Sequence, residues 1–257
     1  LAGAREAGTV RLYAVTVAAG FLYPGILLED AYYESPPAYR GVYSLDPGSG
    51  PWIPRTNGIA AGHRPLFVGL CRTNAAVAWL GGQTDDDYPA VYRTADGGSN
   101  WQNVIAVGSA QNVATGWCGH QGDRDYTYDA YYVGFAVSPM DAGRAALTGY
   151  GFVHATTNGG QTWFAAYTSP ADRNPAGGAT PRGKAYRSAG LENTTCWGVS
   201  WSSPSNLFAS FSDIRGLRSV DGGSSWGFTF TGNTYNTTYD VVSRSNGTLY
   251  AAVSSVH

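Results

Sequence analysis

A short segment that ends in tryptophan occurs three times in this sequence, nearly unchanged, and a looser fourth copy precedes them. The close copies span residues 94–101, 156–163 and 219–226 and read Ser/Thr-x-Asp/Asn-Gly-Gly-x-x-Trp, and the looser copy spans 44–52. We call these four segments the repeat turns. Their acidic or amide residues, Asp46, Asp96, Asn158 and Asp221, lie 50, 62 and 63 residues apart. Repetition at such intervals indicates successive copies of one supersecondary unit.

Each repeat turn lies between short runs that predict β-strands, and further paired runs precede it. A full unit then has four antiparallel strands, with the repeat turn joining the last two, which is typical of a propeller blade. The pattern predicts full blades at 57–108, 129–168 and 195–232, and partial blades at 1–56 and 233–257. The first partial blade has three predicted strands, beginning with Val10–Val17, and the last has two.

Composition favours an all-β fold and excludes some functions. Glycine accounts for 35 of 257 residues, 18 Tyr and 8 Trp supply large rings for a core, and Lys and Met occur once each. With a net charge of −2 and 13 % charged residues, no basic excess is available for nucleic acid. No run of about 20 apolar residues predicts a transmembrane segment.

The repeat turns resemble the Asp-box, or BNR repeat, of sialidases, xyloglucanase-type glycoside hydrolases, sortilin-like receptors and photosystem-assembly propellers. This resemblance implies a larger β-propeller, with the missing blades supplied by the rest of the protein or by another chain. An Asp or Asn side chain can accept N–H groups of its own turn, glycine allows a positive φ, and tryptophan packs under the turn. We therefore predict structural, not catalytic, roles for Asp46, Asp96, Asn158, Asp221, Trp101, Trp163 and Trp226.

The long connections are expected at the end of the blades opposite the repeat turns. Alternate connections of an up-and-down sheet lie at opposite ends, and the insertions at 20–39, 53–64, 108–130 and 169–194 share one end. Loops of this length inside a compact domain are usually functional. We therefore expect a binding surface there and call it the loop face.

The insertion at 108–130 suggests a cation site. Asp123, Asp125 and Asp129 alternate with other residues, so their oxygens can gather around Ca²⁺. Solvated loop residues are the alternative, and no other cofactor is expected. His120 is a candidate acid, base or ligand-binding residue. Four aromatic residues of the insertions are predicted to be exposed and to stack on a sugar ring or a peptide: Trp117, Tyr126, Tyr128 and Tyr186.

The insertion at 169–194 carries a basic cluster. Arg173 and Arg187, with Tyr186 and Glu192, can bind a carboxylate or sugar hydroxyls. A loop tied together by its own ion pairs is an equally open interpretation, since exposed pairs often contribute little.

Asp213 is the sharpest catalytic candidate, because it directly follows a predicted strand and is expected on the loop face. The segment Asp213-Ile-Arg215-Gly is similar to a turn that carries a carboxylate in xyloglucanase-type hydrolases. Glycoside hydrolysis needs two carboxyl groups roughly 5–10 Å apart, and Asp123, Asp125, Asp172 or Glu192 can supply the second. Arg215 either binds ligand or pairs with Asp213 to shape the turn. A sialidase is less favoured, because the Arg-Ile-Pro segment of that family is absent.

Two classes of function remain open. The first is a secreted, periplasmic or cell-surface carbohydrate-active propeller, a glycoside hydrolase if it is an enzyme, acting on a polysaccharide through paired carboxylates. The second is a non-catalytic propeller that binds a protein or glycan partner. In an exported protein, Cys118 and Cys196 are the expected disulfide pair, with Cys71 left as a buried thiol.

Overall fold

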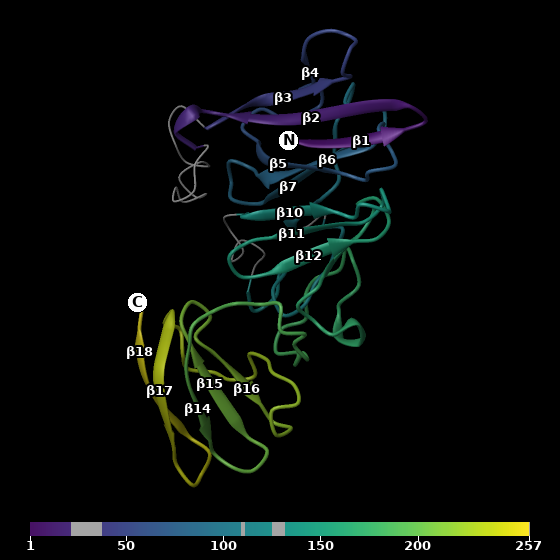
Figure 1. The fold of residues 1–257 in the computed structure, drawn as a ribbon. Coiled ribbons are helices and arrows are strands. Elements are labelled where there is room, and N and C mark those ends of the chain that lie inside the picture. The colour runs from purple at the N-terminus through teal and green to yellow at the C-terminus, as the bar shows by residue number, and fades with distance from the viewer. Residues whose placement is uncertain (22–37, 109–110, 125–131, 257) are drawn as a thin grey trace.

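Five β-sheets follow one another in the part of the chain that the structure describes (Figure 1). The structure, a computed structural model, describes residues 1–21, 38–108, 111–124 and 132–256. Helix in these residues is limited to short 3₁₀ turns such as Ala19–Phe21 and Pro170–Asp172. Nowhere in the described ranges is a helix long and apolar enough to cross a membrane. The all-β prediction is confirmed.

Each of the first three sheets has four consecutive antiparallel strands, and the third has a fifth, parallel strand. The first contains β1 (Ala2–Glu6), β2 (Thr9–Val17), β3 (Tyr39–Leu45) and β4 (Ile53–Pro54). The second contains β5 (Arg64–Leu70), β6 (Ala78–Gln83), β7 (Pro89–Thr94) and β8 (Gln102–Asn103). The third contains β10 (Gly134–Val137), β11 (Ala145–Thr148), β12 (Val153–Thr156) and β13 (Trp163–Ala165), and β9 (Val113–Ala114) pairs in parallel with β13.

The last two sheets are smaller. The fourth contains β14 (Cys196–Trp201), β15 (Leu207–Phe211) and β16 (Gly216–Ser219). The fifth contains β17 (Thr237–Ser243) and β18 (Leu249–Ser254). In Figure 1 these strands lie at the other end of the molecule from β1 and run steeply across those of the first three sheets. The described blades thus form an open arc, which is part of a propeller.

Two strand predictions were wrong. The first sheet has a fourth strand, β1, which the sequence hides because Ala2–Glu6 contains no β-branched or aromatic residue. It is joined to β2 by Ala7 and Gly8, both with positive φ. The fourth sheet lacks its predicted last strand, because Trp226 bridges Tyr186 of the 169–194 insertion and only Gly227 bridges β16.

Successive sheets are joined by buried apolar clusters. Strand β5 packs against β1 and β2 on one side and against β10 on the other. The first junction is filled around Tyr13 and Leu80, and the second around Trp79 and Leu147. At the third junction the cluster includes Trp117, which belongs to a long insertion rather than to a sheet. The third and fourth sheets are therefore joined through inserted segments.

The three close repeat turns share one hydrogen-bond pattern. In the second sheet, Asp96 Oδ1 accepts the Asn100 backbone N–H (3.0 Å) and the Thr94 hydroxyl (2.8 Å), and the Gly98 N–H donates to Thr94 Oγ1 (3.0 Å). The corresponding bonds in the third and fourth sheets measure 2.8–3.1 Å. Each turn is thus closed by its own side chains.

Charge distinguishes the otherwise matching turns. The Asn100 side chain and backbone donate to Asp96, those of Ser225 donate to Asp221, and these bonds lower the pKa of each aspartate to about 2. In the looser first turn, Asp46 instead receives two bonds of 2.6 Å from Arg11, which lower its pKa. The expectation that Asp46 accepts N–H groups of its own turn was therefore wrong.

The tryptophan of a repeat turn fastens its sheet to the preceding one. Trp101 Nε1 donates to the Arg55 carbonyl (2.8 Å), and Trp163 Nε1 donates to the Val104 carbonyl (2.9 Å). Each acceptor lies three residues after the tryptophan of the preceding repeat turn. We call this contact the inter-sheet tryptophan bond. Trp101 and Trp163 are 4 % and 0 % exposed, so the indole rings are packed as well as hydrogen-bonded.

The third junction lacks this bond. The corresponding acceptor for Trp226 is the carbonyl of Ala166, but Trp226 Nε1 donates to Gly223 of its own turn (3.0 Å). The backbone of Trp226 is bonded to Tyr186 in both directions, at 2.8 and 2.9 Å. The insertion that carries Tyr186 thus separates the repeat turn of the fourth sheet from the third sheet.

This difference predicts unequal costs for two truncations. Trp163→Ala is expected to lower the free energy of unfolding by about 3–5 kcal/mol, because it removes a fully buried ring and its inter-sheet bond. Trp226→Ala is expected to cost less than half as much, because the ring is only half-buried. Urea unfolding of both variants measures the difference. Equal losses would show that Trp226 is as firmly packed as Trp163.

Candidate functional site

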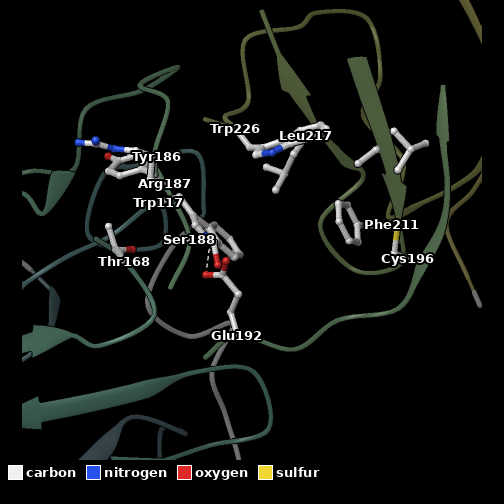
Figure 2. Close-up of a pocket in the computed structure, with 12 residues that line it drawn as sticks. Trp117, Thr168, Tyr186, Arg187, Ser188, Glu192, Cys196, Phe211, Leu217 and Trp226 are labelled. Carbon is white, nitrogen blue, oxygen red and sulfur yellow. Dashed lines mark hydrogen bonds between the residues drawn. The ribbon is translucent and has the colours of Figure 1, made fainter. Parts of the chain in front are cut away.

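A pocket of about 250 Å³ opens between the third and fourth sheets, where the inter-sheet tryptophan bond is missing (Figure 2). One wall comes from the insertions at 108–130 and 169–194, and the other comes from β14, β15 and β16. We call this the wedge pocket. Its lining is mostly apolar with a few polar groups, which is typical of small-molecule sites.

Aromatic rings form the inserted wall. Trp117 packs edge-on against Phe152 and Phe228, with ring centroids 5.0 and 5.6 Å apart. The Tyr186 hydroxyl and Asn174 Nδ2 are 2.9 Å apart in a hydrogen bond. Both Trp117 and Tyr186 are buried, so the prediction that they are exposed was wrong. Both rings still line the wedge pocket, because the insertions fold inward between the sheets.

Glu192 supplies the carboxyl group of the wedge pocket. Residue 192 forms an isolated bridge with Phe152, which holds it at the margin of the third sheet. Its Oε2 accepts the Trp117 Nε1–H (3.2 Å), and its side chain also bonds Ser188 (Figure 2). Burial raises the pKa of Glu192 and outweighs these two bonds, which lower it. The protonated carboxyl is thus favoured more than in water.

Thr168 adds a polar group that has no partner. Its side chain is 0 % exposed and lines the wedge pocket (Figure 2). Within the described ranges its hydroxyl makes no hydrogen bond. A buried hydroxyl without a partner is costly, so a ligand that bonds it gains affinity.

The fourth sheet forms the opposite wall. Phe211 and Leu217 face the inserted wall across the pocket (Figure 2). Val199 also lines the pocket and is 51 % exposed. Cys196 begins β14 on this wall as a free thiol, and Cys118 is buried in the apolar cluster of the third junction. The predicted disulfide between them is therefore not formed. Cys71 is a buried thiol, as predicted.

The basic cluster is mainly structural. Arg187 donates two bonds of 2.7 Å to the carboxylate of Asp172, and this pair lowers the pKa of Asp172 to about 2. Arg173 donates to the carbonyls of Ala165 and Thr168, and its guanidinium lies over the ring of Phe164 in β13. The interpretation of a loop tied by its own ion pairs is confirmed for Arg187, although Arg187 also lines the wedge pocket.

Asp213 lies outside the wedge-pocket lining, in a strained turn between β15 and β16. Both Asp213 and Arg215 have positive φ, 62° and 69°, and each is the centre of a tight turn closed by one backbone hydrogen bond. Such turns store strain, which is common at functional sites. Asp213 Oδ1 accepts Asn236 Nδ2 (3.2 Å), and Ile214 anchors the turn in the core.

Of the calcium and acid–base candidates in the 108–130 insertion, the described residues Asp123 and His120 do not line the wedge pocket. Asp123 Oδ2 accepts the Gly183 N–H (2.6 Å), and the His120 carbonyl accepts the Thr180 N–H (2.8 Å), so both residues tie the two insertions together. Asp125 and Asp129 lie outside the described residues. No group of three His, Cys, Asp or Glu side chains suited to a metal occurs among those described. The calcium site stays a prediction.

The pocket residues that sequence reasoning missed have ordinary types and no motif. Thr168, Ser188, Val199 and Leu217 become neighbours only because the third junction is held open. The available signal was the length of the 169–194 insertion, which shows that the third and fourth blades are joined differently.

A comparison with a solved structure supports the fold. An ancestral GH74 enzyme superposes with a TM-score of 0.52 at 17 % identity, over 96 % of this chain and 32 % of that enzyme. This chain therefore spans about a third of its length. The GH74 xyloglucanase of Xanthomonas campestris (TM-score 0.42, 15 % identity, 84 % of this chain, 37 % of that one) superposes less well. So does YCF48 bound to D1 peptide (0.34, 14 %, 84 % of each chain).

No family model and no curated protein matches the sequence. The chain is thus defined by its structure as part of a β-propeller, with a fold similar to part of the ancestral GH74 enzyme.

Glu192 predicts a pH dependence of stability. The pKa of Glu192 is higher in the folded protein than the ordinary glutamate pKa of 4.5. Ionisation of Glu192 therefore destabilises the fold as the pH rises above 4.5. Glu192→Gln keeps an oxygen acceptor for Trp117 and cannot ionise. The variant is therefore expected to gain stability relative to the wild type between about pH 4 and pH 7. Guanidinium unfolding at both pH values measures this gain, and a constant difference would contradict the assignment.

Proposed function

We propose that the chain is a carbohydrate-binding part of an exported Asp-box propeller, and that the wedge pocket holds one sugar ring. The observation that carries this proposal is the set of groups around one small cavity: the rings of Trp117 and Tyr186, the carboxyl of Glu192 and the unpartnered hydroxyl of Thr168. Aromatic faces bind the apolar faces of a sugar, and the two polar groups bond its hydroxyls.

Size and charge support a neutral ligand. The volume of about 250 Å³ lies just below the range of pockets for drug-sized molecules, so it suits a single ring. The one cation of the lining, Arg187, is already paired with Asp172. The raised pKa of Glu192 favours its protonated form. This form is uncharged, so it prefers hydroxyl groups of a ligand to a cation as partners.

Glycoside hydrolysis is the second candidate, and the raised pKa of Glu192 favours it. A general acid in hydrolysis must hold its proton near neutral pH, which burial promotes. In this proposal Asp213 is the second carboxylate, since its strained turn follows Phe211 of the pocket wall. Release of reducing sugar from xyloglucan or β-glucan, lost in both Glu192→Gln and Asp213→Asn, tests this role.

Thr168→Val separates binding from stability. The substitution removes a hydroxyl that has no partner in the empty pocket, so the variant is expected to be about 1 kcal/mol more stable. The same change removes a bond to the ligand and is expected to weaken binding about fivefold. Denaturant unfolding measures the first effect. Tryptophan fluorescence during titration with glucose, xylose and xyloglucan oligosaccharides measures the second.

Thr248→Val, in the exposed turn between β17 and β18, is the matched control and should change neither value. Sugar binding that is unchanged in Thr168→Val would exclude the wedge pocket as the binding site. Binding of an apolar peptide but of no sugar would favour the protein-partner class instead.

A further inference from the structure

A second cavity lies between the second and third sheets, at the end that carries the repeat turns. Its volume is about 420 Å³. Among the residues that the structure describes, its polar lining residues are Arg93, Gln102, Asn103, Asn112, Asn158 and Gln161, and no acidic residue lines it. We call it the Arg93 pocket. It contains one cation and several amides, and sequence reasoning assigned only structure to this end of the blades.

The guanidinium of Arg93 has no partner of opposite charge. Its Nε is buried, and within the described ranges the side chain makes no ion pair and no hydrogen bond. Its Cζ lies 5.5 Å from the centre of the Trp79 ring, which holds the side chain in place. A Cβ built on Gly159 would lie 3.7 Å from Nε, so the group faces the repeat turn of the third sheet. A half-buried cation in this state favours an anion from outside the chain.

Two other arginines at comparable places are satisfied. Arg11 lies against Gly97 of the second sheet's repeat turn, and Asp46 binds it through two bonds of 2.6 Å. Arg218 precedes Ser219 as Arg93 precedes Thr94, and it donates to Asn206 Oδ1 and to the Thr229 carbonyl at 3.1 Å each. The unpaired state of Arg93 is therefore not a general feature of such positions.

The repeat turn of the third sheet, next to Arg93, lacks the negative charge that the close copies in the second and fourth sheets carry. Asn158 stands where the other close copies have Asp96 and Asp221, and its Oδ1 makes the same two acceptor bonds to its own turn. The Asn158 Nδ2 donates to Thr162 Oγ1 (2.9 Å), at the place where the Ser225 hydroxyl donates to Asp221, so a carboxylate can replace the amide in this turn. The difference removes a carboxylate from the lining of the pocket that holds Arg93.

From these observations we propose that the Arg93 pocket binds a small oxyanion: a phosphate, a sulfate or a carboxylate. The planar guanidinium matches two oxygens of such a group. The exposed side chains of Gln102 and Gln161 line the same pocket and add uncharged donors. The proposal is independent of sugar binding in the wedge pocket.

Asn158→Asp is the decisive variant. It restores the residue of the other close turns, so the fold is expected to persist, and it places a negative charge beside the bound anion. Calorimetric titration of the full chain with inorganic phosphate, sulfate and acetate, at constant ionic strength in chloride, should show saturable binding. Asn158→Asp is expected to weaken it at least about tenfold, because like charges repel. Tighter binding of acetate than of phosphate or sulfate would assign a carboxylate ligand, and the reverse order a tetrahedral one.

Arg93→Lys and Arg218→Lys form a matched pair. Arg93→Lys keeps the charge but loses the planar fork and is expected to weaken binding several-fold. Arg218→Lys, at the corresponding position of the fourth sheet, should bind as the wild type does. Absence of saturable anion binding in the wild type, or equal affinity in the wild type and Asn158→Asp, would overturn the proposal.

Discussion

The hydrogen bond from a repeat-turn tryptophan to a carbonyl of the preceding sheet determines how the blades are joined. Trp101 and Trp163 each make it, and each also fills a buried junction, so one side chain provides both packing and direction. Such a bond specifies the register between two sheets more strictly than apolar contact alone, because a buried indole N–H requires an acceptor. The first three blades therefore follow one geometry.

The wedge pocket results from a single departure from this geometry. Where Trp226 turns back to Gly223, the 169–194 insertion enters the junction and supplies Tyr186, Glu192 and their neighbours. The rings of Trp117 and Tyr186 therefore line a cavity instead of packing fully against a facing sheet. The insertion is held in this junction by the ion pair between Asp172 and Arg187.

Much of the fold was predictable because the repeat turns fix their own conformation. The bonds around Asp96, Asn158 and Asp221 are local, so the sequence pattern alone indicates them. The site was less predictable. Glu192, Trp117 and Tyr186 were identified by residue type, but Thr168 was not, because an unpartnered hydroxyl is a property of packing rather than of sequence. Strand β1 was missed for a related reason, since its small residues are held by pairing with β2.

The exchange of amide for carboxylate at Asn158 also affects how the molecule responds to acid. The hydrogen bonds that Asp96 and Asp221 accept stabilise the fold at pH values above 3.8, the ordinary pKa of aspartate. They weaken as the pH falls toward the lowered pKa of about 2. Asn158 accepts the equivalent bonds without a titrating group. Acid thus loosens the turns of the second and fourth sheets first and leaves that of the third sheet closed.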